Sequence, residues 1–353
     1  MGLGIAIEVG GTADADLANA TWVEVNERMG ETTTYRIRYD FDVSDGDFPL
    51  LADGRIDAGS ELSVVEPVGG DNNCLVKGPV TAHQIHIAHG GTGSWVDVHG
   101  ADTSVTMDRE SKATLWTDVS DSDAVQSILS NYGLTPDADD TDAQHMEDKH
   151  ALVQRDTDLQ FVRRLARRNG FLFWITCDGD GNETAHFKRP PLDGDDGPDL
   201  IINLDSNNLQ WFELEWDVER PTSAAAADVD LSDESDIDGS VEQSPLDPLG
   251  AQALSDIVTD TRSVHLIAPV DDAGDLQSRS EGALIDAGWF IRARCETTLT
   301  ALQQLVRAHT VVNVRGLGSR HSGKYFVAAV KHTIDEAEHR MEIELVRNAW
   351  ESA

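Results

Sequence analysis

The sequence predicts a mainly β protein with α/β insertions. Apolar and polar residues alternate in short runs over residues 1–106 and again over 208–353, as in half-buried strands. Between them, residues 107–207 contain runs with a helical period. At about 150 residues per domain, 353 residues correspond to two or three domains. We therefore expect β domains at both ends of the chain and a helix-containing insert between them.

Short strands are expected throughout the N-terminal segment. Alternating runs occur at 22–26, 35–39, 61–65, 84–88 and 95–99. Turn-forming residues separate them, as in the glycine-rich stretch 90–93. Many short strands without a helical period are typical of a small antiparallel barrel or sandwich.

The insert is expected to hold two helices and a hairpin. Ser120 with Asp123, and Thr157 with Gln160, have the spacing of capping boxes. Gly170 stands where a left-handed C-cap belongs. A hairpin of strands 171–175 and 184–187 follows, and the acidic stretch 137–150 between the two helices is expected to be a solvated loop.

The C-terminal segment is interpreted as a second β domain. It contains an acidic, alanine-rich stretch, 224–248, expected to be a long loop, and a helical pattern at 275–287. Strands are expected at 209–217, 289–295, 311–315, 325–331 and 341–346.

The composition is strongly acidic. The chain has 64 acidic and 27 basic residues, only six of them lysine, and a net charge of −37. Such a charge opposes nucleic-acid binding and anchoring to anionic lipid. The 40% hydrophobic content is sufficient for folded cores. A dispersed, lysine-poor acid excess suits concentrated salt, where the Debye length falls to about 3 Å at 1 M, so we expect a halophilic origin.

The cysteines and the apolar runs give further expectations. Cys74, Cys177 and Cys295 are far apart and odd in number, which argues against a disulfide framework or a zinc knuckle. We expect all three to be buried hydrophobes. The N-terminus does not resemble a secretory signal, and no apolar run is long enough to span a membrane.

Three motifs resemble ligand sites but depart from them. Residues 318–324 fit the phosphate-loop spacing, but Tyr325 replaces the magnesium-binding Ser or Thr, so a turn between strands is expected. Residues 178–189 lack the glycine and glutamate of a calcium loop and are interpreted as a hairpin tip. His83, His86 and His89 alternate in direction on a strand and cannot easily share a metal. His145 and His150 are expected to be exposed. We therefore assign no catalytic residue, cofactor or metal ligand.

An arginine cluster stands out in this acidic chain. Arg163, Arg164, Arg167 and Arg168 lie in the last turns of the second predicted helix. The favoured explanation is helix support, because basic residues complement the helix dipole and pair with nearby acids. The alternative is a docking face for an acidic neighbouring subunit.

Two segments in this order carry a family resemblance. Residues 153–171 resemble a signature of the phage late control gene D family and of VgrG-like hubs, in which the helix precedes an aromatic strand. Residues 314–335, which include Gly318, Gly323 and Tyr325, resemble the closing strands of the same family. The helix expected near residues 123–134 also lies where that family has a helix.

The resemblance implies a baseplate or tail hub in the virion. In that family, two tandem β-barrels joined by α/β insertions assemble as a trimeric, pseudo-sixfold ring. The ring caps the tail-tube protein and adapts its symmetry to a trimeric spike. VgrG proteins continue into a β-helical spike whereas this sequence stops at Ala353, so a separate spike polypeptide is expected. Tape-measure and baseplate wedge proteins are further expected partners.

Two alternatives remain open at this point. One is a tail-associated hydrolase on a hub scaffold, which the absence of a recognisable acid, base or nucleophile set disfavours. The other is the hub of a virus-like contractile injection or secretion device.

Overall fold

The computed structural model describes residues 3–41, 50, 54–147, 151–193, 196–229, 236–260, 262–266 and 273–351. Strands dominate and helices are few, as the sequence predicts. The largest sheet contains 13 of the described strands. They are β1 (Ala6–Val9), β2 (Thr12–Ala13), β3 (Trp22–Arg28), β4 (Thr34–Phe41), β5 (Glu61–Val68), β6 (Asp71–His86), β7 (Ser94–Ala101), β15 (Asp196–Ile201), β16 (Leu209–Trp216), β21 (Ile291–Thr298), β22 (Val311–Arg315), β23 (Gly323–Asp335) and β24 (His339–Arg347).

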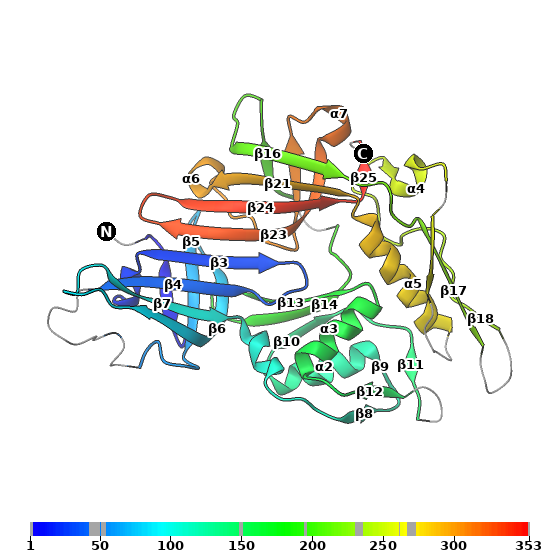
Figure 1. Ribbon diagram of the computed structural model, residues 1–353, viewed down its shortest axis with the longest axis horizontal. Helices are drawn as coiled ribbons and strands as arrows, with labels where there is room; N and C mark the ends of the chain where they lie inside the picture. The colour runs from blue at the N-terminus through cyan, green and yellow to red at the C-terminus, as the bar shows by residue number, and fades with distance from the viewer. Residues whose placement is uncertain are drawn as a thin grey trace.

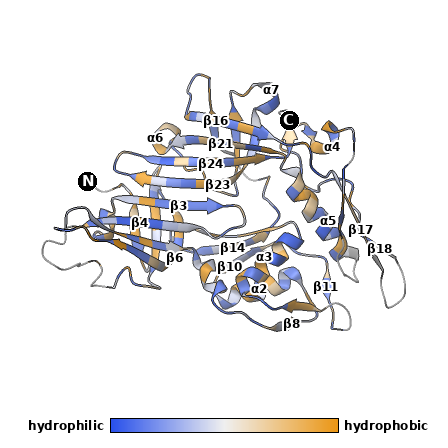
Figure 2. Ribbon diagram, viewed as in Figure 1, coloured by the Kyte–Doolittle hydropathy of each residue, from blue (hydrophilic) through white to orange (hydrophobic). Residues whose placement is uncertain are grey.

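This sheet runs through both β segments of the chain. Its order is β16-β21-β24-β23-β3-β4-β7-β6-β5-β1-β2, and β22 with β15 branches from β23 (Figure 1). We call β1–β7 the N-terminal β region, and β15, β16 and β21–β24 the C-terminal β region. Hydrophobic and hydrophilic residues alternate along many of these strands (Figure 2). The expected strands of both segments are present.

Strand β23 joins the two β regions. Along one edge, residues 323–326 pair with β22 and residues 329–335 pair with β3. A bulge between Val327 and Ala329 separates these two parts, and bulges increase local twist. Ile334, near the end of β23, is buried in the core of the N-terminal β region. The two β regions thus share a strand and part of a core.

The insert packs two helices on a small sheet. Helix α2 (Asp121–Asn131) begins with the predicted capping box, in which Ser120 and Asp123 exchange hydrogen bonds of 3.0 and 3.1 Å. Helix α3 (Asp158–Arg168) begins at Thr157, whose Oγ1 accepts the Gln160 N–H at 3.3 Å. The remaining strands of the insert are β8 (Thr114–Trp116), β9 (Val119–Ser120), β10 (Thr135–Ala138), β11 (Gln144–His145), β12 (Leu152–Gln154), β13 (Leu172–Cys177) and β14 (Glu183–Lys188).

The stretch 137–150 is not the solvated loop that we expected. Strand β10 pairs in parallel with β14, and β11 pairs with β9. His145 is only 6% exposed, so its predicted exposure is wrong; His150 lies outside the described residues. The acidic sequence suggested solvent, but buried polar contacts hold this segment against the helices.

The stretch 224–248 also contains regular structure. Strand β17 (Ser223–Val229) pairs with β18 (Asp236–Asp238) and, in parallel, with β20 (Ser263–Leu266). Helix α5 (Ala273–Gly288), expected at 275–287, covers this sheet, and Ala226 and Leu276 form a small core. Small alanine side chains allow this close packing, which the acidic composition concealed.

Short elements complete the described fold. They are the 3-10 helices Leu17–Asn19 and Thr103–Asp108, the helices α4 (Leu254–Ile257), α6 (Leu299–Leu302) and α7 (Gly318–His321), and the strands β19 (Gln252–Ala253) and β25 (Ala349–Trp350). No described helix has both the length and the apolar character to cross a membrane.

A disulfide corrects the prediction for two of the cysteines. Cys74 of β6 and Cys177 of β13 are bonded, with their Cα atoms 5.5 Å apart and a sequence separation of 103. Only the packing of the insert on the N-terminal β region brings them together. Cys295 is a free, buried thiol, as expected, and burial raises its pKa to about 12.

Candidate functional site

Arg168, at the end of α3, points into the protein. Its Nε donates to Asp121 Oδ2 at 2.9 Å, and its Nη2 lies 3.0 Å from Nε2 of the buried His145. A third neighbour, Asp275 of α5, lies 3.7 Å away. Burial alone would raise the pKa of Asp121, but hydrogen bonds and the Arg168 charge hold it below the usual range. Arg168 therefore joins α2, α3, β11 and α5.

Arg163 also turns inward, toward the N-terminal β region. Its Nη2 donates to Oγ1 of Thr32 at 2.7 Å. Burial lowers its pKa, while the nearby Asp102 carboxylate opposes this effect. Two of the four arginines thus support the internal structure.

Arg164 and Arg167 remain on the surface. Arg164 bonds Asp156 at 3.3 Å and lies 5.1 Å from the ring centre of Phe161. Arg167 is exposed, and its side chain makes no ion pair or hydrogen bond with the described residues. A docking face on α3 is consequently limited to these two side chains.

Substitutions should separate the two roles. Arg168→Ala is expected to lower the free energy of unfolding by about 2 kcal/mol, because Asp121 loses a buried cation but keeps other donors. The double charge reversal Arg164→Glu/Arg167→Glu should cost less, about 1 kcal/mol, because both side chains are exposed and only the Arg164 pair with Asp156 and the favourable helix-end charge are lost. Urea unfolding of each variant measures both effects; equal losses would contradict this assignment.

The residues 318–325 surround a buried arginine. The hairpin turn expected there contains the helical turn α7, and Tyr325 donates to the His321 carbonyl at 2.7 Å. Gly323 has φ +129°, and a Cβ there would lie 2.8 Å from Nη2 of Arg347. Gly318, at φ +75°, begins α7 with open space around it. The motif therefore shapes a loop around Arg347 and is not a phosphate loop.

Arg347 itself is fully buried. Its guanidinium donates to the carbonyl oxygens of Leu249 (3.1 and 3.2 Å), Ser322 (3.3 Å) and Glu351 (2.5 Å). It also lies 5.1 Å from the Tyr325 ring centre. No ion pair of Arg347 is recorded within the described part of the chain. Backbone carbonyls from three segments thus hold it, and nothing in the sequence around Arg347 indicated this role.

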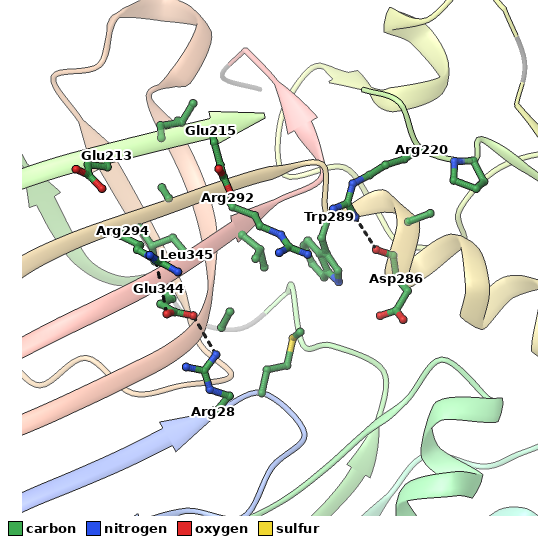
Figure 3. A pocket seen from close by; sticks show the side chains of 17 residues that line it. Arg28, Glu213, Glu215, Arg220, Asp286, Trp289, Arg292, Arg294, Glu344 and Leu345 are labelled. Atoms are coloured by element: carbon green, nitrogen blue, oxygen red, sulfur yellow. Dashed lines mark hydrogen bonds and ion pairs between the residues drawn. The ribbon is translucent and has the colours of Figure 1, made fainter. Parts of the chain in front are cut away.

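A groove of about 1100 Å³ lies beside the C-terminal β region and the end of α5 (Figure 3). Oppositely charged residues alternate across its strands: Glu213 is opposite Arg294, which is opposite Glu344. Arg28 pairs with Glu344 at 3.0 Å. No described lining residue is a serine, cysteine or histidine. The groove is therefore a mixed-charge surface suited to polar contacts.

Arg307 connects the two β regions. Its Nε lies 2.5 Å from Oε1 of the buried Glu27, and its other nitrogens donate to the carbonyls of Cys74 and Leu75 at 2.8 and 3.0 Å. Although burial opposes ionisation, the Arg307 charge and hydrogen bonds lower the pKa of Glu27 to about 2. Sequence reasoning missed Arg307, because it lies in an irregular segment with no motif.

The insert meets the C-terminal β region through stacked rings. Trp174 lies between His186 and His309, with ring centres 4.6 and 4.2 Å apart. The Gly30 N–H donates to Nε2 of His309 at 3.3 Å. Burial lowers the pKa of His309 to about 3, so this ring is neutral. The insert and both β regions therefore meet in one place.

The other motif residues have structural contacts. Nε2 of His83 lies 2.5 Å from the Ile56 carbonyl oxygen, and His86 stacks on Trp95. Asp178 accepts the Asn182 N–H at 2.8 Å and closes the β13–β14 hairpin. Among the described residues, no group of three potential ligands could hold a metal ion.

Comparison with protein families gives one match over most of the chain. The family model described as the Alg8 N-terminal domain matches residues 3–336. The chain belongs to this family. No curated protein matches the sequence significantly.

Solved structures with a similar fold include tail and secretion-system proteins. The 43 kDa tail protein of prophage MuSo2 from Shewanella oneidensis is 14% identical, with a TM-score of 0.67 and 98% of each chain covered. The tail protein from Neisseria meningitidis MC58 is 13% identical, with a TM-score of 0.66 and 98% and 97% covered. These similarities confirm the predicted resemblance at the level of the fold.

A third similar structure comes from a secretion system. The E. coli c3393 protein is described as a component of the type VI secretion system with structural similarity to the T4 bacteriophage tail proteins gp27 and gp5. It is 11% identical, with a TM-score of 0.61, and the match covers 98% of this chain and 79% of that protein. The fold therefore occurs in both phage tails and secretion devices.

Proposed function

We propose that this protein is a structural hub subunit of a tail baseplate or tail tip. The observation that carries this proposal is the match to phage tail proteins over 98% of the chain, with a TM-score of 0.67. Both β regions and the insert take part in that match. The hub caps the tail tube and adapts its sixfold symmetry to a threefold spike during assembly and delivery.

The assembly that we propose is a trimer. Segments 1–106 and 208–353 would each supply a barrel, and 107–207 would be the insert between them, so three copies give a pseudo-sixfold ring. The sheet shared through β23 supports this arrangement, because it fixes the two β regions of one subunit relative to each other. Closed oligomers of this type need extended interfaces between identical subunits.

The proposed partners are a tail-tube protein and a separate trimeric spike, with tape-measure and baseplate wedge proteins nearby. The exposed pair Arg164 and Arg167 and the mixed-charge groove are the candidate contact surfaces. In a chain of net charge −37, surfaces that carry cations allow an acidic neighbour to approach. The proposed location is the virion tail, with no membrane insertion and no specific nucleic-acid binding.

A second candidate is the hub of a contractile injection or secretion device. The similarity to the type VI secretion component supports it, with a TM-score of 0.61. Capsid and terminase genes next to the gene for this chain would favour the virion over a secretion device.

We propose a non-enzymatic role in either particle. The groove carboxylate Glu344 is engaged by two arginines, at 3.0 and 3.7 Å, which argues against Glu344 as a free acid or base. We attribute most of the acidic excess to life in concentrated salt. The hydrolase alternative would require turnover of a cell-wall or glycan substrate by the purified chain.

The solution mass of the purified protein tests this proposal. In concentrated salt the chain is expected to be a trimer, or to become one with the tube protein, and Arg164→Glu/Arg167→Glu should weaken that binding while the fold persists. Light scattering and co-sedimentation with tube protein measure both. A stable monomer that binds neither tube nor spike would contradict the hub.

A further inference from the structure

Two histidines of the β23–β24 hairpin form a buried pair at the contact between the β regions. His332 is fully buried, and His339 is 6% exposed. Nδ1 of His332 lies 3.0 Å from Nε2 of His339. One ring therefore donates a hydrogen bond to the other.

Each outer nitrogen of this pair faces a carboxylate of the N-terminal β region. Nε2 of His332 lies 3.7 Å from Oε1 of Glu27 on β3, and Nδ1 of His339 lies 3.5 Å from Oε2 of Glu66 on β5. Within the described residues, neither nitrogen has a hydrogen-bond partner. Oε2 of Glu66 is also buried without a partner. The four side chains thus lie in a row from Glu27 to Glu66, in which only the contact between the two rings is a hydrogen bond.

The number of protons shared by these four side chains follows from their geometry. Two neutral imidazoles carry two N–H groups on four nitrogens. The contact between the rings uses one N–H, which leaves one for the two outer nitrogens. One carboxylate would then face a lone pair, and a buried polar atom without a partner costs about 1–3 kcal/mol. A single additional proton removes this mismatch.

The surrounding charges also match one additional proton. Arg307, on the segment before β22, neutralises Glu27, and His309 beyond it is neutral because burial lowers its pKa to about 3. No arginine or lysine among the described residues pairs with the Glu66 carboxylate, and the ionisable group that faces it is His339, at 3.5 Å. One additional proton therefore leaves the whole cluster without net charge.

The environment indicates which end of the chain holds the proton. Burial lowers the pKa of His332, against the opposing effect of Glu27. His332 is therefore neutral, donates through Nε2 toward Glu27 and accepts from His339. The additional proton belongs to the opposite end.

We propose that Glu27, His332, His339 and Glu66 form a buried proton-binding site that couples the two β regions. The proton lies between His339 and Glu66, and with it both outer nitrogens present an N–H to a carboxylate, at 3.5 and 3.7 Å. The ring nitrogens that face each other are 3.0 Å apart, which leaves no space for a metal ion between the rings.

The site makes stability depend on pH in a defined direction. An unfolded histidine releases its proton at a pKa of about 6.5. The proposal requires the folded protein to keep this proton at higher pH, so stability falls as the pH rises above about 6.5.

Glu66→Gln tests the proposal, because a glutamine amide can bond Nδ1 of His339 without the additional proton. From about pH 6.5 up to the pH at which the folded protein releases this proton, the unfolding constant of the wild type should rise up to about tenfold per pH unit relative to Glu66→Gln. The control Glu342→Gln makes the same charge change on the exposed side of β24, where the side chain is 54% exposed, and should keep the wild-type dependence. Denaturant unfolding at constant salt, from about pH 6 to pH 9, gives these constants.

Nitrogen NMR of ¹⁵N-histidine-labelled wild type gives a second readout that does not depend on the variant folding. At neutral pH, Nδ1 of His339 is expected to carry or share a proton with Glu66, and Nδ1 of His332 is expected to be bare. Unfolding constants that change with pH in the same way in the wild type and in Glu66→Gln would overturn the proposal. So would a His339 that stays neutral, with a bare Nδ1, across the folded range.

Discussion

Replacing Cys177 with serine is expected to lower the free energy of unfolding by about 2–5 kcal/mol. The disulfide closes a loop of 103 residues between β6 and β13, so it restricts the unfolded chain strongly. It also ties the insert to the N-terminal β region beside Arg307, which bonds the Cys74 carbonyl at 2.8 Å. Urea unfolding in concentrated salt measures the loss.

Reduction provides the matched control for this prediction. Wild type treated with reductant should become as unstable as untreated Cys177→Ser, and the variant should not respond to reductant. In Cys295→Ala, the free energy of unfolding should differ between oxidised and reduced samples by as much as in the wild type, because Cys295 is outside the disulfide. A wild type whose stability is insensitive to reductant would contradict this account.

Arg347→Met is expected to lower the free energy of unfolding by about 4 kcal/mol. Methionine can fill much of the space, but the carbonyls of Leu249, Ser322 and Glu351 lose their donor. Each buried acceptor left without a partner costs about 1–3 kcal/mol. Thermal or urea unfolding gives the difference.

Arg292→Met is the matched control, because Arg292 is exposed on the groove and its substitution should change stability by less than about 0.5 kcal/mol. Gly323→Ala should also lower the free energy of unfolding, because Gly323 has a φ of +129° and a Cβ there would lie 2.8 Å from Nη2 of Arg347. A stable Arg347→Met protein, with the same midpoint as Arg292→Met, would show that the loop around residues 318–325 does not depend on this guanidinium.

The sequence was sufficient for the elements whose determinants are local. The Ser120–Asp123 capping box, the Thr157 cap and the β13–β14 hairpin follow from residues a few positions apart, and all are present. The alternating strands of both β regions are likewise local patterns. Several of these features lie in the segments that carried the family resemblance, which the comparisons confirm at the level of the fold.

The features that sequence reasoning missed depend on contacts between distant segments. Cys74 meets Cys177 only because the insert packs on β6. His145 looked exposed in an acidic stretch, yet Asp121 and Arg168 hold it inside. Arg163 and Arg168 turn inward to Thr32 and Asp121, distant partners that the helical pattern could not identify. No local pattern distinguishes a buried charge with a distant partner from an exposed one.

The shared sheet was equally inaccessible to the sequence. Strand β23 is long enough to pair with β22 and β3 in succession, and the change occurs at a bulge near Ala329. A bulge of this kind has no clear sequence signal when the residues around it are small and apolar. The long range of these contacts also explains why the histidine chain could not be anticipated.

Electron microscopy of particles from the producing cells tests the central claim most directly. An antibody fragment against this chain, or a density map at sufficient detail to place its fold, locates the subunit. The hub account predicts a threefold ring of this chain at one end of the tube, between tube and spike. Labelling along the tube wall, or particles that lack the chain, would contradict it.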